Sequence, residues 1–241
     1  MNPAKGELLY EGKAKKIYAT NQPGLFWVEY KDAATAFNGE KQSTIAGKGR
    51  LNNLISAALF QYLTREGIPN HFVSVISDHE QLVRQVTILP LEVVVRNVVA
   101  GSLARRLGLK EGEPLSRPIL EFYYKDDDLG DPLVTEEHID ALGLAKPKDL
   151  QEIKQLALEV NRLLKKFFEE RNVILVDFKL EFGQTKEGQW LVADEISPDT
   201  CRLWDSQTKE KLDKDLFRFD LGSLEEGYEE ILRRVKPSIN P

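Results

Sequence analysis

The stretch ILVDFKLEFG, residues 174–183, alternates charged and apolar side chains. Asp177, Lys179 and Glu181 stand two residues apart, with phenylalanine or leucine in each gap. Successive side chains of a β-strand point to opposite faces of the sheet, so this alternation predicts a strand with one apolar and one charged face. A solvated charged face is the ordinary explanation of such a pattern. The alternative is that the negative, positive and negative side chains of Asp177, Lys179 and Glu181 face a ligand.

The segments on either side of this strand predict a helix before it and a hairpin partner after it. Apolar residues between 153 and 168 form a helical stripe, and Asp149 followed by Glu152 resembles a capping pair at its start. After the turn GQTKEGQ, the segment WLVADEI (residues 190–196) predicts a second strand that pairs with the first. The register of this hairpin stays open at the sequence level.

The rest of the chain predicts an α+β fold with strands early and helices alternating with strands later. Residues 51–63 carry the one-sided apolar stripe of an amphipathic helix. Ser223 with Glu226 predicts the start of a final helix that ends near Arg233 and Arg234, where the helix dipole favours cations. Short strands are predicted at residues 7–12, 12–20, 25–31, 71–77, 81–89 and 91–99.

Length and composition limit the classes of protein that this chain can represent. With 241 residues, it suits one large domain or two lobes that share a cleft. Its 41% hydrophobic and 30% charged residues are typical of a soluble folded protein. The net charge of −6 argues against nucleic acid or an anionic membrane as a partner. The absence of a signal peptide and of a run of about 18 apolar residues predicts a cytoplasmic protein.

The first basic segment is YEGKAKKIY, in which Gly12 precedes Lys13, Lys15 and Lys16. Backbone amides freed by a glycine turn, together with ammonium groups, suit a polyphosphate. The spacing of a Walker loop is absent, and a glycine flap between two strands is closer to the loop that kinases use. The other interpretation is a solvated basic hairpin.

A second basic segment, ILPLEVVVRNVVAGSLARRLG, runs an apolar strand into Arg96 and then into a short helix at residues 103–107. Ser102 is a good N-cap for that helix, and Gly108 closes it. Arg96, Gly101 and Ser102 could therefore hold a phosphate monoester at a helix N-terminus. An ordinary cap beside a surface arginine explains the segment equally well.

Four acids surround Arg202 in VADEISPDTCRLWD: Asp194, Glu195, Asp199 and Asp205. Mg²⁺ takes one or two protein carboxylates together with phosphate oxygens, and Glu181 with Asp194 is the pair that the predicted hairpin favours. Solvated loop acids are the alternative. The remaining reactive types are interpreted as structural or as spectators: Cys201, His71, His79 and His138.

Two of these stretches together are similar to a known family. ILPLEVVVRNVVAGS (residues 88–102) and LVDFKLEFG (residues 175–183) resemble the two signature segments of the SAICAR synthetase family, the phosphoribosylaminoimidazole-succinocarboxamide synthases. The resemblance spans nearly the whole chain, because further segments fit in the same order. These are GKAKKIY near the start, GKGRLNN at residues 47–53, SPDTCRLWD at residues 197–205 and DKDLFR at residues 213–218.

The resemblance implies an ATP-dependent ligase of purine biosynthesis. Such an enzyme joins the carboxylate of carboxyaminoimidazole ribotide to the amine of L-aspartate and releases ADP and phosphate. The implied fold has two lobes: an N-terminal antiparallel β lobe similar to the kinase small lobe, at residues 1–85, and an α/β lobe similar to ATP-grasp enzymes, at residues 86–241. ATP would lie between them, and the family suggests a homodimer.

The resemblance also implies a role for each matching residue. Lys13, Ala14 and Lys15 would contact the ATP phosphates, and the strand from Arg84 to Ile88 would meet the adenine, with Lys125 as a further contact. Glu181 and Asp194 would hold Mg²⁺. Arg96, Ser102 and Arg202 would bind the ribotide phosphate, whereas Asp177, Lys179, Asp199 and Arg218, with Lys214 as a further contact, would lie near the imidazole and the aspartate.

The implied chemistry suits these residue types. A carboxylate is a poor electrophile, so ATP would first convert it to an acyl phosphate, and transfer between anions needs cations to neutralise charge. A carboxylate such as Asp177 or Asp199 is a candidate to accept the proton of the aspartate ammonium. Two other functions stay open: a small-molecule or lipid kinase, although an H-R-D catalytic loop is absent, and a nucleotide-binding regulatory module without turnover.

Overall fold

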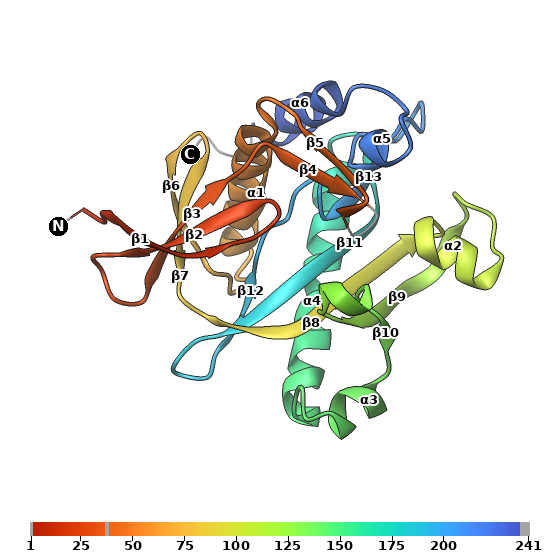
Figure 1. The fold of residues 1–241 in the computed structure, drawn as a ribbon. Coiled ribbons are helices and arrows are strands. Elements are labelled where there is room, and N and C mark those ends of the chain that lie inside the picture. Colours follow the sequence, from red (N-terminus) through yellow and green to blue (C-terminus); the bar gives the residue numbers. More distant parts are fainter. Residues whose placement is uncertain (1, 37–38, 237–241) are drawn as a thin grey trace.

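The computed structural model describes residues 2–36 and 39–236, and its first lobe is built on a five-stranded sheet (Figure 1). Every neighbouring pair in this sheet is antiparallel. The strand order is β1 (Lys5–Glu11), β2 (Lys15–Thr20), β3 (Leu25–Tyr30), β7 (Glu80–Arg84) and β6 (Phe72–Ser77), and a separate ribbon pairs β4 (Ala33–Ala36) with β5 (Lys41–Thr44).

The second lobe is built on a larger sheet whose centre is the pair β8–β11. All its strand pairs are antiparallel as well. Its order is β10 (Leu133–Val134), β9 (Pro114–Tyr124), β8 (Thr87–Val98), β11 (Val173–Gln184) and β12 (Trp190–Ala193), with β13 (Cys201–Asp205) also paired to β11. The predicted α+β class and its two-lobed arrangement are confirmed.

Strand β11 has the predicted alternation, but both of its faces are buried. Phe178, Leu180 and Phe182 lie in the main hydrophobic core. On the opposite face, Asp177 is only 4% exposed and Glu181 only 3% exposed. The interpretation of a solvated charged face is therefore wrong. Buried charges need paired partners, so this face must be explained by what it contacts.

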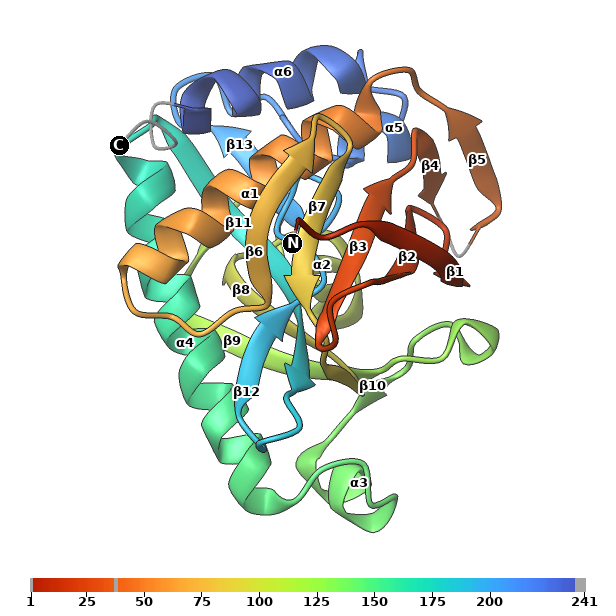
Figure 2. The ribbon, with the colours of Figure 1, turned by 90° about the vertical axis from the view of Figure 1, so that its left-hand side faces the viewer.

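Helix α4 (Pro147–Glu169) covers the apolar face of the larger sheet, as Figure 1 and Figure 2 show. Its buried side chains recur at helical spacing and join the core of β11. The predicted capping pair of Asp149 and Glu152 is wrong, because the N-cap is Lys146 and the first helical residue is Pro147. Backbone N–H groups in the first turn of a helix have no partner within the helix, so proline, which lacks this group, is well tolerated there. The helix therefore starts at Pro147, two residues before Asp149.

Helix α1 (Lys48–Arg65) starts three residues before the predicted stripe and packs against both lobes. It contacts β6 and β7 of the first sheet and helix α6 (Leu224–Val235) of the second lobe, beside which it lies in Figure 2. The Ser223 cap of α6 is confirmed, because its hydroxyl accepts a hydrogen bond from the Glu226 N–H at 3.2 Å. Helix α1 is therefore a shared structural element of the two lobes.

Shorter helices lie at the edges of the larger sheet. They are α2 (Gly101–Leu107), α3 (Glu136–Ala141), α5 (Asp215–Arg218) and the 3₁₀ turn η2 (Asp127–Leu129). The predicted N-cap role of Ser102 is wrong, because Ala100 is the N-cap of α2 and Ser102 lies inside the helix. Gly108 closes α2, as predicted, and the structure shows it in the left-handed conformation. In the described part of the chain, no helix is long and apolar enough to cross a membrane.

Backbone hydrogen bonds join the two lobes beside the end of β12. Asn70 and Val192 form a parallel bridge, in which the His71 N–H donates to the Val192 carbonyl at 2.9 Å and the Val192 N–H donates to Pro69 at 3.0 Å. Strands change sheet between Arg84 and Thr87, which agrees with a division near residue 85. Because α1 contributes to the core of the second lobe, the predicted domain boundary stays a prediction.

The start of α1 supplies a test of packing. A Cβ atom added at Gly49 would lie 2.6 Å from the Tyr30 carbonyl oxygen, a backbone atom that cannot rotate away. We expect Gly49→Ala to lower the free energy of unfolding by about 1–3 kcal/mol, although alanine is the better helix former. Urea unfolding with a fitted m-value measures the change.

Gly227 in α6 is the matched control. A Cβ atom there would meet Leu216 Cδ1 at 2.5 Å, which is the end of a side chain that can rotate. We therefore expect Gly227→Ala to cost less than Gly49→Ala. Equal losses for the two variants would contradict the assignment of the larger cost to the backbone contact.

Candidate active site

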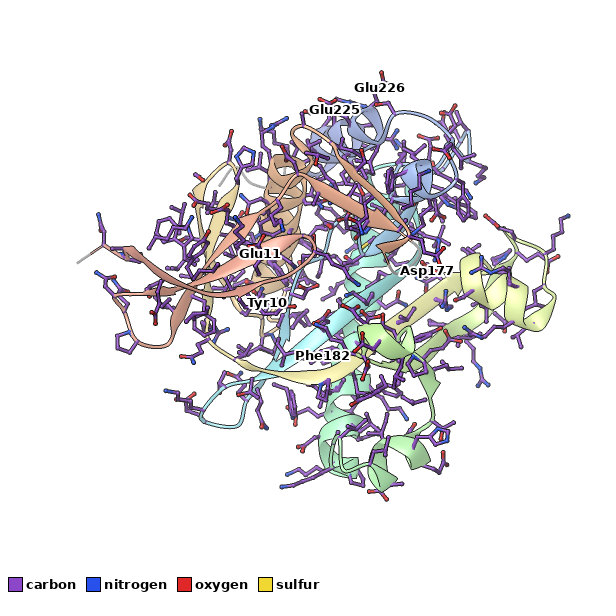
Figure 3. All side chains as sticks on the ribbon, viewed as in Figure 1. Tyr10, Glu11, Asp177, Phe182, Glu225 and Glu226 are labelled. Atoms are coloured by element: carbon purple, nitrogen blue, oxygen red, sulfur yellow. The ribbon has the colours of Figure 1, made fainter. Side chains whose placement is uncertain are left out.

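A cavity of about 760 Å³ opens between the two lobes. Its lining comes from the β1–β2 turn, from the facing sides of β8 and β11, and from the segments at residues 194–202 and 214–218. Figure 3 places Asp177 and Phe182 toward opposite ends of β11, whereas Glu225 and Glu226 lie on the outer side of α6. The charged face of β11 forms one wall of this cavity.

The register of β8 against β11 builds a row of paired charges on that wall. Asp177 lies opposite Arg96, and Glu181 lies opposite Glu92. The Lys179 ammonium is 3.0 Å from a Glu92 oxygen and 2.8 Å from a Glu181 oxygen. Although burial disfavours its charged form, the carboxylates of Glu181 and Asp194 outweigh that effect and hold the pKa of Lys179 well above its ordinary value.

The hairpin register brings together the two predicted metal ligands. Glu181 pairs with Ala193, so Asp194 follows directly after the residue opposite Glu181. Asp194 directly follows β12 and has a left-handed φ of 59°. One ammonium group, that of Lys179, is 2.8 Å from Glu181 and 3.8 Å from Asp194, and Lys125 forms a second ion pair with Glu181. The two carboxylates therefore converge on one point of the cavity.

The basic turn of the first lobe reaches across the cavity to the same acids. Lys15 forms ion pairs with Asp194 and, at 3.0 Å, with Glu195. Burial opposes the charge of Asp194, but Lys15 and then Lys179 outweigh it and lower the pKa of this carboxyl. Lys13 contacts Asp127 at 2.7 Å near the cavity rim. Lys16 lies opposite Glu11 and Glu29 in the sheet and does not line the cavity, so only two of the three lysines belong to the site.

A second charged network surrounds Asp177. This carboxylate accepts a hydrogen bond from Arg96 at 2.7 Å and from Arg202 at 3.0 Å. Arg96 also donates to the Ser102 hydroxyl at 2.9 Å. Gly101 has a left-handed φ of 54°, and a Cβ atom there would lie 2.6 Å from the Arg202 guanidinium. The close approach of Arg202 to α2 therefore requires glycine.

A third network holds the end of the cavity near α5. Asp199 contacts Lys48 at 2.5 Å and the Tyr228 hydroxyl at 2.5 Å, and Lys214 lies 3.8 Å away. Arg218 donates to Asp215 at 2.6 Å. Burial disfavours the Asp199 anion, but Lys214 and Lys48 outweigh it and lower the pKa of this carboxyl. The predicted residues Asp199, Lys214 and Arg218 thus share one wall.

The opposite end of the cavity is apolar. Its side chains come from the first sheet, from the connection into β8 and from the start of β8, and they suit a flat, uncharged ring system. They are Ile17, Phe26, Val28, Val83, Val86 and Ile88, with Ala14 and Arg84 among the other lining residues.

Asp205 does not belong to the site, although it follows Arg202 closely in sequence. The antiparallel pairing of β13 with β11 carries it away from the cavity, and it pairs with Arg234 at 2.7 Å. Arg202 contacts Asp177 and Asp215 instead. Of the four acids that stand near Arg202 in sequence, Asp205 is therefore separated from the cavity.

Several residues that line the cavity or support its wall were not singled out from the sequence. Glu92 could have been found, because residues 92, 94 and 96 share one face of a strand. Lys48 and Asp215 stand in the matching segments GKGRLNN and DKDLFR, but neither received a role of its own. Tyr228 stands on the apolar face of the final helix, which indicates packing. Of the three histidines only His71 lines the cavity, and burial lowers its pKa to about 4.

Comparison with known proteins identifies the family. A family model described as SAICAR synthetase matches residues 8–235. The chain belongs to the SAICAR synthetase family. The phosphoribosylaminoimidazole-succinocarboxamide synthase of Halalkalibacterium halodurans is 62% identical over 232 residues, which cover 96% of this chain and 98% of that protein. The predicted resemblance is confirmed.

Solved structures of this family share the fold. The synthase of Ehrlichia chaffeensis is 46% identical with a TM-score of 0.93, and the match covers 95% of this chain and 98% of that chain. A SAICAR synthetase in complex with ADP is 49% identical with a TM-score of 0.92, over 95% and 97% of the two chains. The chain is an enzyme, a ligase that forms a carbon–nitrogen bond in purine biosynthesis.

Cys201, the single cysteine of the sequence, lines the cavity but is buried at 4% exposure. Burial raises the pKa of its thiol, so the reactive thiolate is scarce at neutral pH. We expect a disulfide reagent such as DTNB to leave the native protein unlabelled at pH 8 and to label one thiol per chain in urea. Labelling of the native protein at the rate of an exposed cysteine would contradict the spectator interpretation.

Proposed function

We propose that this ligase joins carboxyaminoimidazole ribotide to L-aspartate, with ATP converted to ADP and phosphate, through an acyl phosphate. The observation that carries the proposal is the buried row of paired charges on β8 and β11, which faces a cavity shared by both lobes. Relatives that carry the synthase name at more than 60% identity, and a relative solved with ADP, support it.

The nucleotide would lie with its base at the apolar end and its phosphates toward the β1–β2 turn. The lining residues Arg84, Val86 and Ile88 support an adenine position there. Lys13 and Lys15, with Ala14 between them, line the cavity where phosphates would follow, and Lys125 approaches from the second lobe. The ion pairs of these lysines with Asp127, Asp194 and Glu181 would be exchanged for pairs with phosphate oxygens.

The residues at the hairpin fit a magnesium ion. Glu181 and Asp194 converge, and Mg²⁺ prefers one or two carboxylates completed by phosphate oxygens and water. Within residues 2–36 and 39–236, no group of three or more His, Cys, Asp and Glu side chains is placed to hold a metal. Two converging carboxylates without a third protein ligand agree with a metal ion that takes its remaining ligands from the nucleotide and from water. When bound, the ion would neutralise charge on the transferring phosphoryl group.

The ribotide would place its phosphate at Arg96, Arg202 and Ser102. Both guanidinium groups are held by Asp177 with bonds of 2.7 and 3.0 Å, which supports a fixed cationic site rather than two mobile side chains. Lys179 stands between this site and the hairpin acids, where it can draw in the substrate carboxylate. This would bring the carboxylate to the nucleotide's terminal phosphate.

The reaction would then run in two steps. An oxygen of the substrate carboxylate attacks the terminal phosphorus, the bond to the ADP oxygen breaks, and ADP leaves. The aspartate ammonium gives one proton to a carboxylate, and the free amine attacks the acyl carbon. The carbon–oxygen bond to phosphate then breaks, phosphate leaves, and the nitrogen loses a second proton and keeps one in the amide. Lys179 and Lys15 would stabilise the negative charge of the first step. Asp177 and Asp199 are the proposed groups nearest to the amine.

Assembly and location complete the proposal. We include a homodimer and a cytoplasmic location, because the family suggests the first and the supply of ATP and aspartate for biosynthesis favours the second. Size-exclusion chromatography with light scattering measures the first, and fractionation of the source cells measures the second.

Product formation tests the proposed function directly. Protein incubated with ATP, Mg²⁺, the ribotide and aspartate should release ADP only when both cosubstrates are present, and mass spectrometry should show the amide. ADP release that does not depend on aspartate would favour a kinase. Tight ATP binding without turnover would favour a regulatory module.

Asp194→Asn tests the metal role. We expect it to lower kcat by at least about a hundredfold, because loss of one charged metal ligand weakens stabilisation of the phosphoryl transition state. Asp205→Asn is the matched control from the same segment, since Asp205 pairs with Arg234 outside the cavity, and it should keep its turnover. Normal turnover of a folded Asp194→Asn variant at ordinary Mg²⁺ would remove Asp194 from this role.

A further inference from the structure

Lys48 is a lysine without access to water in the second position of the GKGRLNN segment. It is 0% exposed, and its ammonium is 2.5 Å from an Asp199 oxygen, Oδ2. Lysine is almost never fully buried unless it is paired, because removing its charge from water costs several kcal/mol. Lys48 does not line the cavity, whereas Asp199 does. Within residues 2–36 and 39–236, Asp199 is the cavity-lining group with which this ammonium forms an ion pair.

Tyr228 holds the other oxygen of the same carboxylate. It is also 0% exposed, and its hydroxyl donates to Asp199 Oδ1 at 2.5 Å. It belongs to α6, whereas Lys48 begins α1, and these two helices pack against each other. Residues far apart in the chain thus reach Asp199 from behind, on the side away from the cavity.

The Asp199 carboxylate keeps acceptor capacity toward the cavity. A carboxylate offers about four lone-pair positions, of which Lys48 and Tyr228 take two. Lys214 adds a third, more distant contact at 3.8 Å, and its side chain lines the cavity beside Asp199. An incoming N–H donor can therefore still bind Asp199 without displacing the two buried groups.

We propose that Lys48 and Tyr228 are positioning residues that hold Asp199 as a fixed anion, so that Asp199 binds the amino group of the amine substrate and does not accept its proton. The inference rests on the proposed function, which supplies aspartate as that substrate. Of the two candidates for the general base, it removes Asp199 and leaves Asp177.

The charges beside Asp199 agree with this role. Lys214 and Arg218 line the cavity together with Asp199; Lys214 lies 3.8 Å from Asp199, and Arg218 is also paired with Asp215 at 2.6 Å. Aspartate carries one ammonium and two carboxylates, which is the complementary set. Burial opposes ionisation of Asp199, but Lys214 and Lys48 outweigh it and hold the carboxyl pKa below its ordinary value, as expected of an anion that binds rather than exchanges a proton.

Tyr228→Phe tests the inference, because it removes only the hydroxyl that fixes Asp199. We expect the KM for aspartate to rise about tenfold, as for loss of a hydrogen bond to a charged group. The inhibition constant of succinate, which has both carboxylates but no amino group, should stay unchanged. The KM values for ATP and the ribotide should stay unchanged as well. Asp199→Asn should also raise the KM for aspartate selectively, and by a larger factor than Tyr228→Phe.

Tyr62→Phe is the matched control. Tyr62 is a helical tyrosine of α1, which packs against the helix α6 of Tyr228. It is partly buried, but its hydroxyl donates to the Leu163 carbonyl at 3.4 Å, away from the cavity. It should leave all four constants as in the wild type. Circular dichroism verifies that each variant is folded.

Three outcomes would overturn the inference. An equal rise of the KM for aspartate and of the inhibition constant of succinate in Tyr228→Phe would indicate a general loosening of the pocket. An unchanged KM for aspartate with a lower kcat would indicate that Asp199 is the base. Unchanged kinetics in Tyr228→Phe would show that the hydroxyl positions nothing. Wild-type protein without aspartate-dependent turnover is a separate result, which refutes the proposed function and with it the inference.

Discussion

The structure depends on one constraint: the charged face of β11 is buried, so each charge on it needs a partner. Asp177 lies between Arg96 and Arg202, and Lys179 lies between Glu92 and Glu181. An uncompensated charge at any of these positions would cost several kcal/mol. These ion pairs therefore depend on one another. The same electrostatic interactions that stabilise the folded sheet also form a rigid wall of alternating charge on which anions can bind.

The constraint extends to the arrangement of the lobes. Lys15 of the first lobe pairs with Asp194 and Glu195 of the second, so the two lobes meet through charges that the nucleotide is proposed to rearrange. Helix α1 and the bridge between Asn70 and Val192 supply contacts that do not change with these charges. Apolar packing therefore fixes where the lobes stand, and the ion pairs determine what the cavity can hold.

The sequence predicted those features that depend on periodicity. The alternation of residues 174–183 predicted β11, and its hairpin with β12 brought Glu181 and Asp194 together as proposed. Features that depend on register or direction were missed. Asp205 follows Arg202 in sequence, yet an antiparallel strand carries it out of the site. Lys48 received no role within its matching segment, and the helix of Tyr228 was interpreted as structural. Only three-dimensional packing brings a helix start and a distant helix face to one carboxylate.

Gly101 carries a consequence of its own. Its left-handed backbone and missing Cβ leave room for the Arg202 guanidinium, which would otherwise meet a carbon atom at 2.6 Å. The position of the Arg202 guanidinium thus depends on a glycine, which has no charge and no side chain. A single added methyl group would displace a full positive charge, so shape at residue 101 sets the electrostatic potential that an anionic substrate encounters.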